Sequence, residues 1–86
     1  SKIDKKSFRN LTRLQILNLN DNCLFKLEID LFDSNILINN LNLAKNVLKT
    51  VKYFNFEYLV SLNSLNLSLS NIIEIEARSF IYLTSL

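Results

Sequence analysis

Residues 14–24, LQILNLNDNCL, decide how this chain is interpreted, because their order of apolar and asparagine positions returns twice at one fixed spacing. The copies start at Leu14, Ile38 and Leu62, at a constant step of 24 residues. A column of phenylalanines keeps the same step: Phe8, Phe32, Phe56 and Phe80. A strict period without an intervening linker predicts a repeat architecture rather than one irregular domain.

Composition agrees with a small folded unit. The chain has 86 residues, which is at most one small domain with little surface to bury. Hydrophobic residues make up 49% of the chain and charged residues 21%, so a packed core is expected and disorder is not. Gly and Pro, which usually form turns, are absent, and asparagine is expected to take over their role.

Each copy begins with the pattern L-x-x-L-x-L, in which apolar and polar residues alternate. This alternation predicts a strand with one buried face, and the wider apolar spacing that follows predicts irregular or short helical structure. One unit cannot bury its leucines alone, so stacked units should place them in columns of a parallel sheet. Two such columns are expected: Leu17, Leu41 and Leu65, and then Leu19, Leu43 and Leu67.

In its leucine, asparagine and phenylalanine positions, the chain resembles the leucine-rich repeats of extracellular animal proteins, in the 24-residue subtype LxxLxLxxNxLxxLxxxxFxxLxx. Toll-like receptors, adhesion proteins and small matrix proteoglycans carry such repeats. The resemblance implies an α/β-type solenoid: a horseshoe fragment with a parallel β-sheet on its concave face and an irregular or short helical convex side. It also implies one array fragment over residues 1–86, cut from a longer array. Its parts are a partial repeat at 1–13, full repeats at 14–37, 38–61 and 62–85, and the start of the next at 86.

Within this pattern, the motif asparagines Asn22 and Asn46 should turn inward and bind backbone groups, and the phenylalanine column should form core. Two positions depart from the pattern. Ser70 replaces the third asparagine, which should weaken that bonding. Asn35 occupies a leucine position, where Ile36 is expected to turn inward instead. One column of charges is predicted to form a solvated ladder with a central lysine that pairs with its neighbours: Asp4, Glu28, Lys52 and Glu76.

Catalysis is not expected. The chain has no histidine and one cysteine, Cys23, which excludes Ser–His and Cys–His nucleophiles and histidine-based zinc sites. Nothing in the charge column suggests a water-excluding pocket, and Asp30 and Asp33 are too few ligands for calcium. No enzyme activity, cofactor or metal is therefore predicted. Cys23 can form no internal disulfide and is expected to be a half-exposed small hydrophobe.

The strand residues that point away from the core are the candidate binding surface. Repeat register gives four rows: Ile16, Asn40 and Ser64; Asn18, Asn42 and Asn66; Asn20, Ala44 and Ser68; Asp21, Lys45 and Leu69. The predicted contact residues among them are Asn18, Asn20, Asp21, Asn40, Asn42, Lys45, Ser64, Asn66 and Ser68. This amide-rich, weakly charged face favours a protein ligand, or a glycan, over nucleic acid. A compatible alternative is that its central asparagine row forms a self-satisfied amide ladder along the sheet.

Other surface features leave alternatives open. Phe25, Phe54, Tyr58 and Tyr82 stand at variable positions. They predict either an apolar contact patch or packing against a neighbouring loop, and the second is favoured. Basic residues near the start could meet a polyanion, but no nucleic-acid motif accompanies them, so a solvated loop is the better interpretation.

Two N-glycosylation sequons begin at Asn10 and Asn66, about as many as chance would give. Asn10 falls in a loop-like segment and is the expected acceptor if the protein is secreted. Asn66 falls within a strand of the candidate binding face, where a glycan would obstruct a ligand.

These features predict a non-catalytic protein-recognition segment of an extracellular leucine-rich-repeat receptor or adhesion protein. Two alternatives stay open: spacer repeats that set the reach of a longer solenoid, and an intracellular scaffold, which the single cysteine suggests. No apolar run is long enough to span a membrane, so membrane attachment is expected only through other parts of a parent protein. The expected location of that parent is extracellular or at the cell surface.

Overall fold

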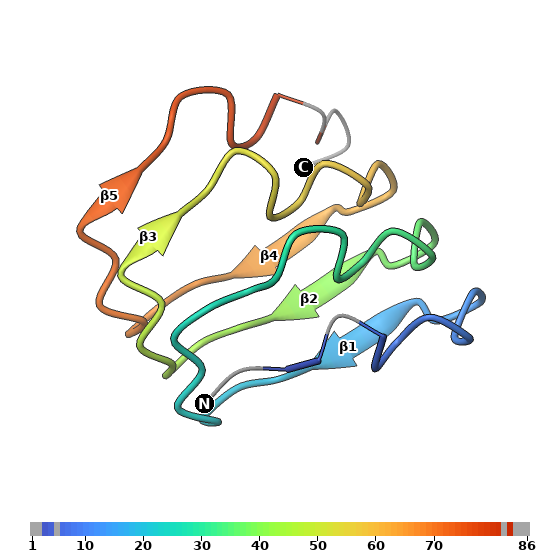
Figure 1. Ribbon diagram of the computed structural model, residues 1–86, viewed down its shortest axis with the longest axis horizontal. Helices are drawn as coiled ribbons and strands as arrows, with labels where there is room; N and C mark the ends of the chain where they lie inside the picture. Colours follow the sequence, from blue (N-terminus) through green and yellow to red (C-terminus); the bar gives the residue numbers. More distant parts are fainter. Residues whose placement is uncertain (1–2, 5, 82, 84–86) are drawn as a thin grey trace.

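The computed structural model describes residues 3–4, 6–81 and 83, and Figure 1 shows their path. Within these residues the regular secondary structure consists of short parallel strands without a helix. One sheet has the order β1-β2-β4 and is formed by β1 (Ile16–Asn18), β2 (Asn40–Asn42) and β4 (Ser64–Asn66). A second sheet pairs β3 (Thr50–Val51) with β5 (Glu74–Ile75).

Both sheets keep the period of the sequence. Leu17 pairs with Leu41, and Leu41 pairs with Leu65. In the second sheet, Val51 pairs with Ile75. Every pair joins residues 24 positions apart, so one sequence repeat carries the chain around once and back beside the preceding strand (Figure 1). We call each such step a winding. The leucines therefore pair in parallel at the offset that their spacing predicts.

The second sheet occupies part of the chain that the sequence pattern predicts as irregular or helical. β3 consists of Thr50 and Val51, β-branched residues that favour extended backbone. Farther along each winding the chain forms successive tight turns, in which an N–H donates to the carbonyl three residues earlier. Leu59 donates to Phe56 in this way at 3.0 Å. These turns do not continue into a helix anywhere in the described residues.

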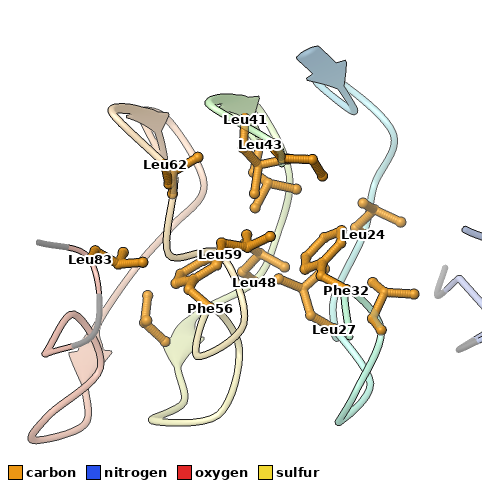
Figure 2. Close-up of a cluster of buried hydrophobic side chains, with 13 residues drawn as sticks. Leu24, Leu27, Phe32, Leu41, Leu43, Leu48, Phe56, Leu59, Leu62 and Leu83 are labelled. Atoms are coloured by element: carbon orange, nitrogen blue, oxygen red, sulfur yellow. The ribbon is translucent and has the colours of Figure 1, made fainter. Parts of the chain in front are cut away.

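The core lies inside the windings, and Figure 2 shows Leu41 directed into it from β2. The phenylalanine column belongs to this interior, as predicted. Its rings stack in pairs, Phe8 on Phe32 with centroids 6.0 Å apart and Phe56 on Phe80 at 6.2 Å. The buried residues of the cluster are Leu24, Leu27, Leu31, Phe32, Ile38, Leu41, Leu43, Leu48, Val51, Phe56, Leu59, Leu62 and Leu83. Most of them come from the central winding, which has a neighbour on each side.

Asn46 turns inward as predicted and is buried. Its Oδ1 accepts the backbone N–H groups of Asn22 at 3.0 Å and Leu24 at 2.9 Å. Its Nδ2 donates to the carbonyl groups of Leu19, Leu43 and Ala44. Asn22 itself is exposed, and its Nδ2 donates to the carbonyl of Asn20. Asn22 thus binds a backbone group at the end of its strand, as predicted, but it is not turned into the core, because β1 is an edge strand of the sheet.

Ser70 takes the place of the motif asparagine in the third winding and is buried. Its Oγ donates to the carbonyl of Leu43 at 2.8 Å and accepts the N–H of Asn46 at 3.4 Å. A hydroxyl has one proton, so Ser70 links the windings through fewer short bonds than Asn46 does. β4 nevertheless pairs with β2 in full register.

Asn35 rather than Ile36 lies in the core, so the prediction that Ile36 turns inward is wrong. Asn35 is fully buried, whereas Ile36 is 48% exposed. The Nδ2 of Asn35 donates to the carbonyl groups of Phe8 at 2.9 Å and Leu11 at 3.0 Å, both in the preceding winding. These bonds offset part of the cost of burying the amide. Its Oδ1 has no partner among the described residues, so the side chain is only partly satisfied.

Asparagine takes over the turns in part, as the side-chain oxygens of Asn18, Asn42 and Asn66 bond locally, but most of the left-handed positions are held by other residues. Residues with positive φ occur at one equivalent place in each winding: Asp21 at 57°, Lys45 at 58° and Leu69 at 55°. The other such residues are Cys23, Asp30, Lys49, Asn71 and Arg78. Such backbone is unfavourable for bulky side chains with a Cβ, and Asn71 is the one asparagine among the described positive-φ residues. Other asparagines, such as Asn46 and Asn55, act through side-chain hydrogen bonds.

The predicted charge column is formed in part. Lys52 Nζ lies 3.5 Å from Glu76 Oε2, which joins neighbouring windings. Glu28 of the same column lies 3.8 Å from Lys26 of its own winding. The lysine of each pair is about half exposed, and ion pairs at the surface contribute about 0–1 kcal/mol each.

Candidate binding face of the three-stranded sheet

The exposed face of the three-stranded sheet carries the predicted contact residues. Register sets Asn40 beside Ser64, and Asn42 between Asn18 and Asn66. Neighbouring strands of a sheet lie about 4.8 Å apart, so each row is a line of adjacent side chains. Asn42 is half-buried, and the other predicted contacts are exposed. The remaining four follow directly after the strands: Asn20, Asp21, Lys45 and Ser68.

The central asparagine row is fixed by local hydrogen bonds. The side-chain Oδ1 of Asn18, Asn42 and Asn66 accepts the backbone N–H two residues farther on, at 3.1, 2.9 and 3.0 Å. Within the part of the chain that the structure describes, none of the three donates through Nδ2 to another group. The predicted amide ladder is therefore absent, because each carbonyl oxygen is used within its own winding. Three amide N–H₂ groups are left to face solvent.

After each of the first two strands, backbone hydrogen bonds to the next winding set the position of the charged side chains. The backbone N–H of Asp21 donates to the carbonyl of Ala44, and that of Lys45 donates to Ser68, each at 2.9 Å. Asp21 and Lys45 are exposed at equivalent places in adjacent windings. No ion pair joins them among the described residues. Ala44, which the sequence places in an exposed row, is buried instead, because the central winding is covered on both sides.

The face also carries apolar residues that the predicted contact set omits. Ile16 is 67% exposed at the start of the first row, and Leu69 is 74% exposed at the turn after β4. Both share repeat positions with predicted contacts, so the repeat register was the signal that could have included them. Amide donors, one carboxylate, one ammonium and two apolar side chains can together bind a polypeptide surface.

The variable aromatic residues divide between exposure and packing. Phe25 is 55% exposed, whereas Phe54 is half-buried. The hydroxyl of Tyr58 donates to Asp30 Oδ1 in the preceding winding at 2.9 Å. That hydrogen bond, followed by the negative charge of Asp30, raises the pKa of Tyr58 above its ordinary value of 10.0. Tyr58 thus contacts a neighbouring loop, and Tyr82 lies outside the described residues.

The structure also bears on a metal site, a membrane-spanning helix and the exposure of the single cysteine. In residues 3–4, 6–81 and 83, no three His, Cys, Asp or Glu side chains are grouped to hold a metal ion. No helix with the length and apolar character of a membrane span occurs in the same residues. Cys23, predicted to be half-exposed, is exposed.

The two sequons differ in their surroundings. Asn10 is exposed among the turns that precede the first repeat, and Thr12 of its sequon is exposed as well. Asn66 lies in β4, where its Oδ1 accepts both the N–H and the Oγ–H of Ser68, at 3.0 and 2.7 Å. Asn10 is therefore the more accessible acceptor.

Comparison of the sequence with models of known families gives no match, and a search of curated proteins gives none either. The register, exposure and chemistry of this chain's own residues are therefore the basis for assigning a function.

Proposed function

We propose that this chain is a segment of an extracellular leucine-rich-repeat protein, and that it recognises a protein ligand without catalysis. The recognition surface is the exposed face of the three-stranded sheet. The observation that carries the proposal is the central row of that face, where the 24-residue register sets the amides of Asn18, Asn42 and Asn66 side by side. A receptor or adhesion protein is the class of parent that this arrangement suits.

The repeat assignment is supported by three features that one period connects. The leucine strands pair in parallel at a 24-residue offset, Asn46 binds backbone groups of the winding before it, and the phenylalanine rings stack in two pairs between neighbouring windings. The paired leucines and the stacked rings lie at the same place in consecutive windings. A solenoid built of leucine-rich repeats accounts for all three.

Protein recognition is supported by the chemistry and stiffness of the face. Each asparagine of the row has its Oδ1 held by a backbone N–H, which fixes the side chain before a ligand arrives. Side chains that are already ordered lose less entropy on binding. Their Nδ2 groups can donate to peptide carbonyls, and Ile16 and Leu69 add apolar area at the margin. That apolar area favours a protein over a glycan.

A binding experiment tests the proposal. The full chain is screened against a panel of extracellular protein domains, and each binder is measured again with an N42A/K45A variant. Binding should weaken about tenfold or more, the loss typical of central contact residues, with an unchanged circular dichroism spectrum. Asn63→Ala is the matched control, since Asn63 is an exposed asparagine just before β4. Binding that survives N42A/K45A but is lost in Phe54→Ala or Tyr58→Ala would place the contact surface elsewhere.

A spacer role is the second candidate, and one observation favours it. The Oδ1 atoms of Asn18, Asn42 and Asn66 are all used in local turns, so the row also has a purely structural purpose. Deletion of residues 38–61 from the parent protein separates the two functions. A spacer should tolerate the loss of one winding, whereas a contact surface should lose its ligand.

The extracellular location has its own test. Expressed in a secretory host, the protein should carry a glycan on Asn10, which mass spectrometry of the peptides detects. An unmodified Asn10 in secreted material would argue against this location and favour an intracellular scaffold, in which the exposed Cys23 would stay reduced. Attachment to a membrane would require parts of a parent protein outside this chain.

A further inference from the structure

A cavity of about 250 Å³ lies where the segment after β1 meets the segment around β3 in the next winding. Its lining residues are Phe25, Lys26, Leu27, Leu48, Thr50, Lys52, Phe54 and Asn55. None of them belongs to the predicted contact set on the sheet face. A cavity of about 150 Å³ accepts benzene, and sites for drug-sized ligands begin near 300 Å³. This cavity therefore has room for one aromatic ring with a short substituent.

The interior of the cavity is apolar. Leu27 and Leu48 form part of its wall and belong to the buried core, where they lie on neighbouring windings (Figure 2). Phe54 adds an aromatic surface, and its ring is held edge-on against Tyr53 with centroids 5.3 Å apart. Phe25 is more than half exposed, so a bound ring would cover apolar surface that water now contacts.

The cavity is held in shape by a buried side chain. Asn55 accepts the backbone N–H of Lys52 through Oδ1 at 2.7 Å and donates through Nδ2 to the carbonyl of Leu27 at 3.3 Å. The first bond lies within one winding, and the second connects the two windings that form the walls. Asn55 is buried, and both of its polar atoms are engaged. The site is thus formed before any ligand binds, which lowers the cost of association.

Two lysines among the lining residues can give the cavity a preference for an anionic ligand. Lys26 and Lys52 line it from the two windings, whereas their partners Glu28 and Glu76 do not. The Lys–Glu distances are 3.8 and 3.5 Å, and at least one partner of each pair is largely exposed. Such pairs are weak. Either ammonium can therefore turn toward a carboxylate at the cavity without a large loss.

We propose that this cavity binds a small aromatic carboxylate. The ring lies against the apolar wall formed by Phe25, Leu27, Leu48 and Phe54, and the carboxylate contacts the Nζ atoms of Lys26 and Lys52. This site is separate from the sheet face and does not depend on the function proposed for that face.

A pair of matched probes tests both halves of the site. Phenylpropionate and phenylpropanol are titrated into the full chain, and binding is followed through amide signals in NMR spectra. Phenylpropionate should shift the signals of Phe25, Thr50 and Lys52. The neutral alcohol should bind about fivefold more weakly or worse, because it lacks the charge that the two lysines attract.

Variants assign the effect to named side chains. In K26Q/K52Q the acid and the alcohol should bind equally, whereas Lys45→Gln, a lysine on the sheet face, should leave the preference unchanged. Thr50→Phe places a ring inside the cavity and should abolish binding of both probes, and phenylalanine is well suited to a strand. Circular dichroism shows whether each variant is folded.

Three results would overturn the proposal. The first is the absence of shifts with millimolar phenylpropionate, and the second is equal affinity for acid and alcohol in the unmodified chain. The third is a set of shifts centred on the sheet face, at Asn18 or Asn42, instead of the cavity. A preference for the acid that persists in K26Q/K52Q would refute the assigned role of the two lysines.

Discussion

The side-chain Oδ1 of Asn46 accepts the backbone N–H of Leu24 at 2.9 Å, although the two residues lie 22 positions apart. The bond ties the end of one strand segment to the winding before it. Asn46 makes further bonds through the same oxygen and through Nδ2, and it is buried. A single buried amide thus binds backbone groups of two adjacent windings.

Asn46→Ala should therefore destabilise the fold strongly. A buried donor or acceptor left without its partner costs about 1–3 kcal/mol, and this change removes the bonds of Asn46 to the N–H of Leu24 and the carbonyl of Leu19, so a loss of about 2–4 kcal/mol is expected. Urea unfolding followed by circular dichroism measures it. The control is Asn63→Ala, an exposed asparagine, which should change stability by less than about 0.5 kcal/mol. Equal effects of the two changes would contradict the role assigned to Asn46.

Asn35→Leu should stabilise the protein by about 1 kcal/mol. The change removes the unpaired Oδ1 and adds apolar contact, and the equivalent Leu59 and Leu83 are already buried leucines. The carbonyl groups of Phe8 and Leu11 keep backbone partners, the N–H groups of Leu11 and Leu14. Thermal unfolding should show a rise in Tm of roughly 4–8 °C for a chain of this size. A fall in Tm would mean that the two Asn35 bonds outweigh the gain.

Leu69→Asn should also stabilise the fold, for a different reason. Leu69 holds a φ of 55° with its side chain 74% exposed, so it has an unfavourable backbone and buries little apolar surface. Asparagine tolerates this conformation, and a gain of about 0.5–1 kcal/mol is expected. Ile73→Asn is the control, since Ile73 is also highly exposed but is not among the residues with positive φ. A gain of the same size in both variants would show that lost surface hydrophobicity, not backbone, is the cause.

Tyr58 should make stability fall at high pH. Its phenol donates to Asp30, and the pKa of the folded Tyr58 is raised above the value of 10.0 that an unfolded chain would show. The stabilisation is therefore complete below pH 10.0 and is lost as the pH rises through the raised folded pKa. NMR titration of the Tyr58 ring measures the pKa. Asp30→Asn should move the midpoint back toward its ordinary value, and an unchanged midpoint would rule out the contact.

Much of the arrangement could be predicted from the period alone. Leu17, Leu41 and Leu65 pair as their spacing indicates, because stacked repeats bury identical positions in identical surroundings. The same period placed Asn18, Asn42 and Asn66 in one row. The second sheet was missed because β3 and β5 are each only two residues long, too short for a pattern to reveal.

The sequence by itself determined which residues share a column, since a fixed 24-residue step needs no knowledge of contacts. The tertiary structure decided which members of each column are buried and which hydrogen bonds they make. Asn22 and Asn46 are equivalent in sequence, yet only Asn46 is buried, because it has a winding on both sides. Asn35 lies in the core in place of Ile36, because its amide can donate to the carbonyl groups of Phe8 and Leu11 in the previous winding. The cavity likewise exists only where two windings meet, so no local pattern predicted it.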